Sequence, residues 1–363
     1  MHTLTEEDIG WIVLYECKFP VGLTYNIYKQ IKSGADIVNY EKNIDFWRKI
    51  LGEERFQIFT HKCCMDTIDV FKVQNLKKGI NVITIASEQY PDKLREMANP
   101  PLVLFYLGDI SLLKTTSISI VGTRLVSSYG ASITNRFAMT LAENGITIVS
   151  GLAEGVDTFA HSGALEVNGK TIAVLAGGLS SIYPSINLDL AKKIASKGLL
   201  ITEYRYGDGF LKFHFPYRNR IIAGLSDGVL ITEASNKSGT RHTVEFAIEM
   251  NRNIYAVPGN ITSYKSEYPN RLIKSYNACM VMSPEDILSD LNCSYIPKVA
   301  KEVKQMDLTE AHILDILKEE NQIHFEEILT KTGLETKKLN SILINMELMG
   351  LIVKLPGNNY SLK

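Results

Sequence analysis

Short apolar runs rich in β-branched residues recur through the middle of the chain, and helical periods of apolar residues separate most of them. Runs of this kind predict parallel strands, because such strands are covered on both faces and need no polar alternation. The predicted strands, in chain order, are Val82–Ala86, Leu102–Leu107, Ser117–Val121, Ile146–Val149, Thr171–Leu175, Leu199–Thr202, Val229–Thr232 and Ile254–Val257. The first two are expected to add an edge to the sheet. The pattern therefore predicts an α/β fold with a doubly wound, mostly parallel sheet.

Turns of glycine and small polar residues follow these strands. Gly122, Thr123 and Arg124 come directly after the third predicted strand, and Ser150–Gly155 follows the fourth. Ligands of such sheets bind beyond the carboxyl ends of the strands, where glycine lets backbone N–H groups approach a phosphate. Arg124 adds a forked cation suited to phosphate oxygens. The glycines could do no more than permit tight turns, but their repetition along one edge favours a site for an extended anion.

A second informative stretch, Phe210–Gly224, mixes cations with aromatic rings. Its members of these two kinds are Lys212, Phe213, His214, Phe215, Tyr217, Arg218 and Arg220. Single-stranded nucleic acid is bound by such mixtures, because cations follow the backbone while rings stack on bases. Alternatively, the rings belong to the core and the two arginines pair with Glu203, Glu233 or Asp227. We expect a mixture of both, with at least one of these arginines free to bind a ligand.

His161 lies four residues after Asp157, so the two side chains are expected on one helix face. A structural hydrogen bond or a helix cap explains this pair better than acid–base catalysis. The sequence contains no Ser/His/Asp or Cys/His arrangement typical of a nucleophilic site, and no metal-ligand spacing. We therefore expect no catalytic residues, no metal and no cofactor.

The ends of the chain predict two smaller modules around a central domain at residues 79–291. Residues 1–78 have the pattern of short helices, typical of a helix-hairpin or SAM-like module that grips DNA backbone or only packs. The breaks between these helices are expected at Pro20, Gly22, Gly34, Gly52 and Gly79. Residues 292–306 form a polar linker without a core period.

Residues 307–363 predict a winged helix. Its helices are expected at Leu308–Lys318, His324–Thr332 and Thr336–Met349, and its hairpin strands at Leu351–Lys354 and Asn359–Leu362. This segment carries nine acidic and six basic side chains, whereas a module that binds phosphate is usually basic. A protein-contact or accessory role therefore explains it at least as well as DNA binding.

Composition narrows the setting. The 363-residue chain has a formal net charge of −1, so any basic binding surface must be local. Five cysteines without CxxC spacing are typical of a reducing compartment. No apolar run approaches the roughly 18 residues of a membrane-spanning helix, and the N-terminus lacks the pattern of a signal peptide. We expect a cytoplasmic protein without a membrane partner.

Taken together, these stretches resemble the DNA-processing protein A family, called DprA or Smf. The segments that carry the resemblance are IVGTR (120–124), Tyr129-Gly130, IVSGLAEGVDTFAH (148–161), GKTIAVLAGGL (169–179), Tyr183-Pro184, FPYRNRIIAGLSDGVLITEA (215–234), Ser238-Gly239 and AVPGN (256–260). They cover the chain from about residue 80 to 290. After Ser238-Gly239 the family usually has Ser-Leu-Ile-Thr, whereas this chain has Thr-Arg-His-Thr, which adds the cation Arg241.

The resemblance implies an extended Rossmann domain that binds single-stranded DNA without cleaving it. It also implies that the protein protects incoming DNA, helps to load the RecA recombinase during natural transformation, and forms a homodimer. By this resemblance the DNA-binding residues are Gly122, Thr123, Arg124, Ser150, Gly151, Gly177, Lys212, Phe215, Arg218, Asn219, Arg220, Ser238, Gly239 and Arg241. The dimer interface would involve Asn270, Leu272, Ile273 and Met280, and the face toward RecA would carry Glu245, Ile248 and Asn253. Tyr268 and Asn277 stand near the dimer segment where the family usually has glycine.

Three other functions fit the sequence less well. A nucleotide-cleaving phosphoribohydrolase would need Pro-Gly-Gly-x-Gly-Thr-x-x-Glu, but here four residues separate Thr240 from Glu245 and the Pro-Gly-Gly is missing. A transcription regulator would need a less acidic winged helix. A nicotinamide-dependent dehydrogenase would need G-x-G-x-x-G where this chain has Gly122-Thr123-Arg124.

Overall fold

The computed structural model describes residues 4–31, 33–63, 68–69, 71, 79–293, 308–320, 322–348, 351–355 and 357–362. The chain divides into two compact units, Met1–Tyr295 and Ile296–Lys363. In the described part of the chain, no helix combines the length and apolar character needed to cross a membrane.

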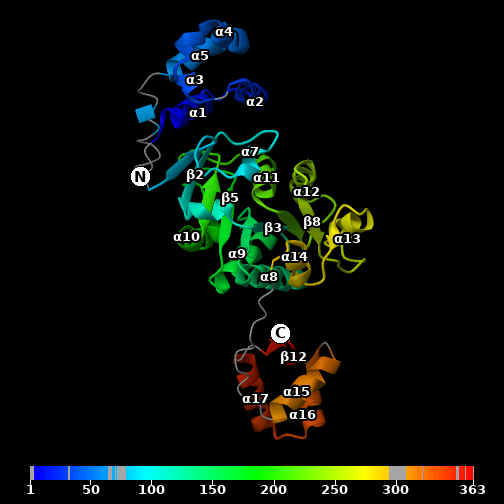
Figure 1. Cartoon of the computed structure of the whole chain (residues 1–363). Coiled ribbons are helices and arrows are strands. Elements are labelled where there is room, and N and C mark those ends of the chain that lie inside the picture. Colours follow the sequence, from blue (N-terminus) through cyan, green and yellow to red (C-terminus); the bar gives the residue numbers. More distant parts are fainter. Residues whose placement is uncertain are drawn as a thin grey trace. The chain divides into compact units, whose positions relative to one another are not determined.

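A single large sheet forms the centre of the first unit (Figure 1). Its strands are β1 (Asn81–Thr84), β2 (Val103–Gly108), β3 (Ser117–Val121), β4 (Thr147–Ser150), β5 (Thr171–Leu175), β6 (Leu199–Thr202), β7 (Gly228–Ile231), β8 (Asn253–Ala256) and β9 (Cys279–Met280). Within the described residues, they are ordered β1-β2-β6-β5-β4-β3-β7-β8-β9. β2 pairs antiparallel with β1 and β6, and the strands from β6 to β9 are parallel. The predicted fold class is confirmed, including the added edge.

Helices cover both faces of this sheet (Figure 1). On one face lie α8 (Ser128–Glu143), α9 (Val156–Glu166), α10 (Leu188–Lys197) and α14 (Pro284–Asp290). On the other lie α7 (Asp92–Arg95), α11 (His214–Leu225) and α12 (Thr240–Glu249), and α13 (Glu267–Lys274) packs near β8. Short 3-10 turns η3 (Ile110–Lys114) and η4 (Ser185–Asn187) complete the domain. Because both faces are covered, the strands carry the uninterrupted apolar runs seen in the sequence.

The N-terminal helices pack on the same core as α11 and α12. They are α1 (Glu6–Glu16), α2 (Val21–Gln30), α3 (Ala35–Val38), η1 (Tyr40–Asn43), α4 (Ile44–Leu51) and α5 (Glu53–Lys62). The break expected at Gly22 is wrong: Pro20 ends the preceding segment as the N-cap of α2, and the helix continues through Gly22. Proline is tolerated there because the first N–H groups of a helix have no internal partner.

Hydrogen bonds join these helices to the central domain. Thr84 Oγ1 donates to Asp8 Oδ1 (2.6 Å), and Tyr15 Oη donates to the Glu203 carbonyl (2.9 Å). Arg205 Nη1 lies 3.1 Å from Glu16 Oε2. The N-terminal helices are therefore fixed to the central domain beside the ends of β1 and β6.

The second unit is a winged helix. Its elements are α15 (Leu308–Glu319), β10 (Ile323–His324), α16 (Phe325–Thr332), α17 (Thr336–Leu348), β11 (Ile352–Leu355) and β12 (Asn359–Leu362). Each helix and each hairpin strand begins and ends within one residue of its predicted range. The sequence pattern missed β10, a two-residue strand that pairs with β12. Such a strand is too short to show any periodicity.

Candidate functional site

The site is located by the order of the strands. From β3 the chain moves through β4 and β5 to β6, and it then returns to place β7 and β8 on the opposite side of β3. The strand order therefore reverses between β3 and β7, which is where ligands of open α/β sheets bind. A cavity of about 1060 Å³ lies there, at the carboxyl ends of the strands.

Most of the residues predicted to bind DNA line this cavity. They are Gly122, Thr123, Arg124, Lys212, Phe215, Arg218, Asn219, Ser238 and Gly239. They come from the turn after β3, from α11 and the loop before it, and from the start of α12. Ser150, Gly151, Gly177, Arg220 and Arg241 do not line it.

The turn after β3 is held rigidly. The Thr123 N–H donates to the Glu233 carbonyl (2.7 Å), and the Thr123 carbonyl accepts from the Val156 N–H (3.2 Å). Gly155 has a φ of +77°, and a Cβ at that position would lie 2.4 Å from the Thr123 carbonyl oxygen. Glycine is therefore required there by both the backbone conformation and the close approach.

Arg124 is the exposed cation of this turn. Its guanidinium carbon lies 5.5 Å from the centre of the Phe215 ring, a cation–π contact. Neither Arg124 nor Lys212, which is also exposed, has a carboxylate partner in the described part of the chain. Both charges are therefore available to an anion in the cavity.

Arg218 also lines the cavity, but its side chain is buried and bound by the protein. Its Nη1 donates to the carbonyls of Gly151 (2.8 Å) and Val174. A Cβ on Gly151 would lie 2.5 Å from the Arg218 guanidinium, so glycine leaves the space that this side chain occupies. Burial lowers the pKa of Arg218 to about 10, although the nearby Asp157 carboxylate raises it. The side chain therefore stays charged at neutral pH.

Arg220 has the structural role considered as the alternative. Its Nη2 lies 2.5 Å from Glu203 Oε2, and its Nη1 donates to the Asn99 carbonyl (3.1 Å). Glu233 binds the Ser127 N–H (2.8 Å) and hydroxyl at the start of α8 instead of an arginine. The expectation that Arg218 or Arg220 would be free is wrong, because protein groups hold both; Arg124 is the exposed arginine among the three.

An aromatic cluster lines the cavity beside Arg124. The ring centres of Tyr183 and Phe210 are 4.5 Å apart, and those of Tyr183 and Phe215 are 5.5 Å apart. Tyr183 and Phe210 are partly exposed and offer ring surface to a ligand. The sequence reasoning did not assign these two rings to the site, since they come from separate loops that only the fold brings together.

Two helix N-termini also face the site. α12 begins after Gly239, and Ser238 Oγ accepts from the Thr240 N–H (3.2 Å). α9 begins after Gly155. Each helix start carries about half a positive charge, which favours an anion. Arg241 is not part of the cavity lining, and its Nη2 lies 3.6 Å from Glu245 Oε1 on the same helix.

The remaining glycine and serine positions bind other parts of the protein. Ser150 Oγ donates to the Ile120 carbonyl (2.7 Å), and the Gly177 carbonyl accepts from Thr202 Oγ1 (2.9 Å). Gly151 donates its N–H to Asp157 Oδ2 (3.0 Å). These groups support the turns behind the cavity and are buried.

His161 and Asp157 have structural roles, as expected, but they are not bonded to each other. His161 Nδ1 lies 2.6 Å from Thr171 Oγ1, whereas Asp157 accepts from the N–H groups of Gly151 and Ala153. Burial, with a smaller effect of the Arg218 charge, lowers the pKa of His161 to about 3. A neutral, buried imidazole is unsuited to exchanging protons with a substrate.

The residues implied for a dimer and for a RecA face lie outside this cavity. Met280 is exposed on β9, whereas Leu272 is buried and Asn270 binds the Gly259 backbone. Ile273 is half-buried. On the helix α12 and after it, Glu245, Ile248 and Asn253 are exposed.

Comparison with known proteins identifies the family. The model of DNA recombination-mediator protein A matches residues 81–292, and the DprA winged helix domain matches residues 300–358. The chain belongs to the DprA/Smf family. It is 42% identical over 216 residues to DNA processing protein DprA of Bacillus subtilis, covering 59% of this chain and 72% of the relative. It is 37% identical over 279 residues to DprA of Streptococcus pneumoniae, covering 73% of this chain and 97% of the relative.

Two solved DprA structures resemble this one. The crystal structure of DprA from Streptococcus pneumoniae has a TM-score of 0.66 at 34% identity, covering 80% of this chain and 99% of that chain. A structure of DNA processing protein A from Helicobacter pylori has a TM-score of 0.54 at 30% identity, covering 60% of this chain and 97% of that chain. The latter addresses the single-stranded DNA binding mode of the Helicobacter protein.

The motif that would favour a phosphoribohydrolase is not assembled at the cavity. Glu245, the acid of that motif, is exposed on α12 and lies 3.3 Å from His242 Nδ1. It is not part of the cavity lining. The acidic residues that do line it are Glu154 and Asp157, and Asp157 is occupied by backbone N–H groups.

Proposed function

We propose that this protein binds single-stranded DNA in the cavity between β3 and β7, protects it, and helps to load the RecA recombinase onto it during natural transformation. We further propose that it catalyses no reaction. The observation that carries the proposal is the combination of Arg124 and Lys212, cations without a carboxylate partner among the described residues, with partly exposed aromatic rings in one cavity. The single-stranded DNA binding addressed for the Helicobacter relative supports the same function here.

The chemistry of the cavity suits a single strand better than a duplex. Unpaired bases present ring faces, and stacking on Tyr183, Phe210 or Phe215 is worth about 1–3 kcal/mol for each base. In a duplex those faces are covered by neighbouring base pairs. Phosphates bind to Arg124, Lys212 and the starts of α9 and α12, and these backbone contacts do not distinguish one base from another.

Titration of labelled single-stranded and duplex oligonucleotides of equal length, at two salt concentrations, tests this function. We expect a preference for single strands and an affinity that falls as salt rises. Arg124→Ala should bind about tenfold more weakly, since it loses a charge-assisted contact. Its salt dependence should be shallower by about 0.7 on a double-logarithmic plot, as expected for one phosphate contact.

Arg136→Ala is the matched control, because Arg136 is an exposed arginine on α8 outside the cavity lining. It should bind as the unaltered protein does. Equal binding by both variants, or equal affinity of the unaltered protein for duplex and single strands, would show that the cavity is not the DNA site.

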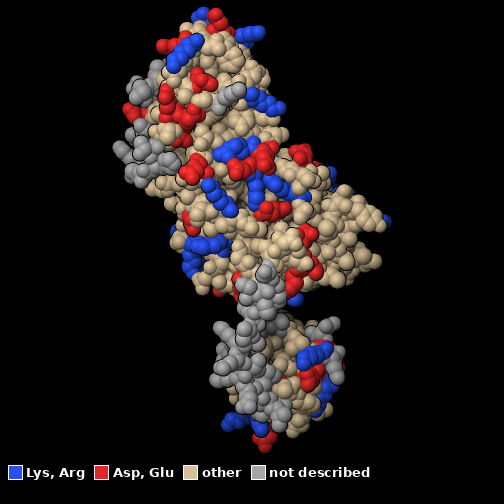
Figure 2. All heavy atoms as spheres, viewed as in Figure 1, with Lys and Arg blue, Asp and Glu red and all other residues tan. Residues whose placement is uncertain are grey.

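We propose that the dimer forms along β9 and α13, and that RecA binds the exposed face of α12. Exposure supports both assignments: Met280 on β9 is 51% exposed and Ile248 on α12 is 54% exposed. In the view of Figure 2, the part that carries α13 shows few charged side chains, although α13 itself carries the exposed Glu267, Arg271 and Lys274. Surfaces with few charges favour protein contacts.

A further inference from the structure

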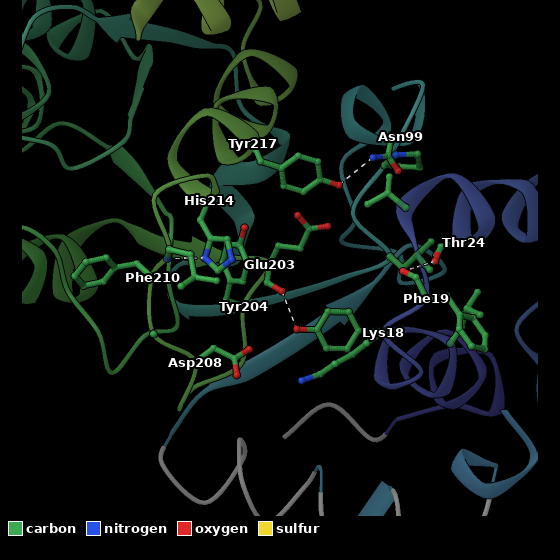
Figure 3. Close-up of a pocket in the computed structure, with 17 residues that line it drawn as sticks. Lys18, Phe19, Thr24, Asn99, Glu203, Tyr204, Asp208, Phe210, His214 and Tyr217 are labelled. Carbon is green, nitrogen blue, oxygen red and sulfur yellow. Dashed lines mark hydrogen bonds between the residues drawn. The ribbon is translucent and has the colours of Figure 1, made fainter. Parts of the chain in front are cut away.

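A second cavity, of about 560 Å³, lies between the N-terminal helices and the central domain (Figure 3). Lys18, Phe19 and Thr24 come to it from the N-terminal segment, and Glu203 and Tyr217 come from the central domain. Sites for small organic ligands usually have volumes of about 300–1,000 Å³ and mostly apolar walls. The size of this cavity therefore fits a group as large as a nucleoside.

Aromatic rings dominate its walls. They belong to Tyr15, Phe19, Tyr204, His214 and Tyr217. Tyr204 and His214 stack on each other with ring centres 4.1 Å apart and an interplanar angle of 19°. A flat aromatic ligand gains most from such walls, because its faces can stack on these rings.

The polar groups of the cavity include two carboxylate acceptors, Glu203 and Asp208. Glu203 uses Oε2 to bind Arg220, and its Oε1 has no hydrogen bond to a described residue. Asp208 also lines the cavity, and its Oδ2 accepts from the Arg205 N–H (3.0 Å). Carboxylates accept hydrogen bonds from the exocyclic amino groups of bases, such as N4 of cytosine. These acceptors therefore favour a base that carries an amino group over thymine.

The two cavities differ in the balance of their charged side chains. The DNA cavity is lined by three cations, Arg124, Lys212 and the buried Arg218, and by two carboxylates, whereas the second cavity has two carboxylates and one cation, Lys18. Carboxylates repel a phosphate and leave a neutral base unaffected. A nucleotide at this place would keep its phosphate outside and insert its base.

The two cavities share a wall. Phe210 and Leu211 line both of them, and both residues are exposed. A strand that follows the cations of the DNA cavity therefore reaches the mouth of the second cavity by passing these two residues. This continuity makes the bound strand the natural source of an inserted base.

We propose that the second cavity is a subsite for a single nucleobase with an exocyclic amino group. The base comes from the DNA strand held in the first cavity, so the inference rests on the proposed function. The same chemistry would also accept the base of a free nucleotide, and the experiment separates these two sources.

Filling the cavity tests the proposal without removing any contact. Val21 lines the cavity and is 48% exposed at the start of α2, so Val21→Trp should fold normally and occupy the space. Asn26→Trp is the matched control, because Asn26 is exposed on the same helix but does not line the cavity. Circular dichroism and unfolding midpoints check the fold of both variants.

The probe is an oligothymidylate with one 2-aminopurine, a fluorescent base with an amino group, placed at each position in turn. We expect strong quenching at one position, where the base stacks in the cavity. Val21→Trp should lose that quenching and bind this probe at least about fivefold more weakly, since base stacking contributes roughly five- to 150-fold in affinity. Asn26→Trp should keep both.

A second comparison tests the carboxylates. With cytosine in place of 2-aminopurine at that position, the unaltered protein should bind more tightly than it binds the all-thymine strand. Asp208→Asn should lose this preference. Glu16→Gln should keep it, because Glu16 binds the same Arg205 but does not line the cavity.

Each result has one reading. If the unaltered protein binds single strands but no position is quenched and Val21→Trp binds normally, the base subsite is wrong while the proposed function stands. If free 2-aminopurine deoxyribonucleoside binds and Val21→Trp abolishes that binding, without any quenched position in the strand, the base comes from a free nucleotide and the strand source is wrong. If the unaltered protein does not bind single strands, both proposals fail.

Discussion

At the scale of single residues, the cavity works because charged side chains of one type have different roles. Arg124 is exposed and without a carboxylate partner in the described residues, Arg218 is buried against two carbonyls, and Arg220 is paired with Glu203. A buried cation is stabilised only when its N–H groups are bonded, which restricts it to holding the backbone. The binding charge is therefore supplied by the residue that the fold leaves exposed.

His161 makes a residue-scale prediction about pH. Its pKa is lowered to about 3 by burial, from an ordinary value of 6.5. Between these values the unfolded chain binds a proton that the folded chain does not, so stability is complete above pH 6.5 and falls as the pH is lowered. One such group changes the free energy of unfolding by at most about 1.4 kcal/mol per pH unit.

Urea unfolding between pH 7 and pH 4 measures this effect. His161→Gln should lose stability with falling pH less steeply than the unaltered protein, because glutamine does not titrate. His61→Gln, at an exposed histidine on α5, should have the unaltered slope. Identical slopes for all three proteins would mean that His161 takes up its proton over the same pH range in the folded and the unfolded chain.

At the scale of elements, β9 is the feature that needs an explanation. It is a two-residue strand whose residues are both exposed, and in the described residues it pairs only with β8. An unpaired strand edge is a ready template for another chain. Exposed Tyr276 and Met282 flank this edge, and their apolar surface would be covered in a dimer.

We predict that Met280→Lys weakens the dimer by at least about tenfold, because forming the contact would require the added charge to be buried without a partner. Sedimentation velocity over a range of protein concentrations measures the change. Ile58→Lys, which alters an exposed apolar residue on α5, should leave the association unchanged. A monomeric unaltered protein, or equal association of Met280→Lys, would rule out this interface.

At the scale of the whole molecule, α12 connects two proposed functions. The helix begins at Thr240 on the DNA cavity and carries the exposed Glu245 and Ile248. Single-stranded DNA would therefore bind near the start of α12, and RecA would bind farther along the same helix. This arrangement would bring the recombinase to the strand without a change of fold.

Ile248→Asp should separate the two activities. We expect single-stranded DNA binding within about twofold of the unaltered protein, since Ile248 does not line the cavity. RecA filament formation on protected single strands should lose its stimulation, because a buried apolar contact becomes an unpaired charge. Val353→Asp, an exposed apolar site in the winged helix, is the comparison. Retained stimulation by Ile248→Asp would place the RecA contact elsewhere.

The architecture could be predicted from the pattern of apolar residues. The predicted strands Ser117–Val121, Thr171–Leu175 and Leu199–Thr202 agree with β3, β5 and β6 at every boundary. This success has a physical reason: strands covered on both faces need continuous apolar runs, and glycine turns end them. The two-residue strands β9 and β10 were not predicted from the pattern, because they are too short to have a period.

The roles of the individual side chains could not be predicted from the sequence, because they depend on contacts between distant elements. Arg124, Arg218 and Arg220 have the same chemistry in the sequence, and they differ in burial and partners only once α11 packs on the sheet beside Gly151, Val174 and Glu203. The second cavity was likewise hidden, because α1 and α2 are distant in sequence from Glu203 and Tyr217. Local patterns encode which surface of an element is buried, whereas a binding site depends on which distant elements meet.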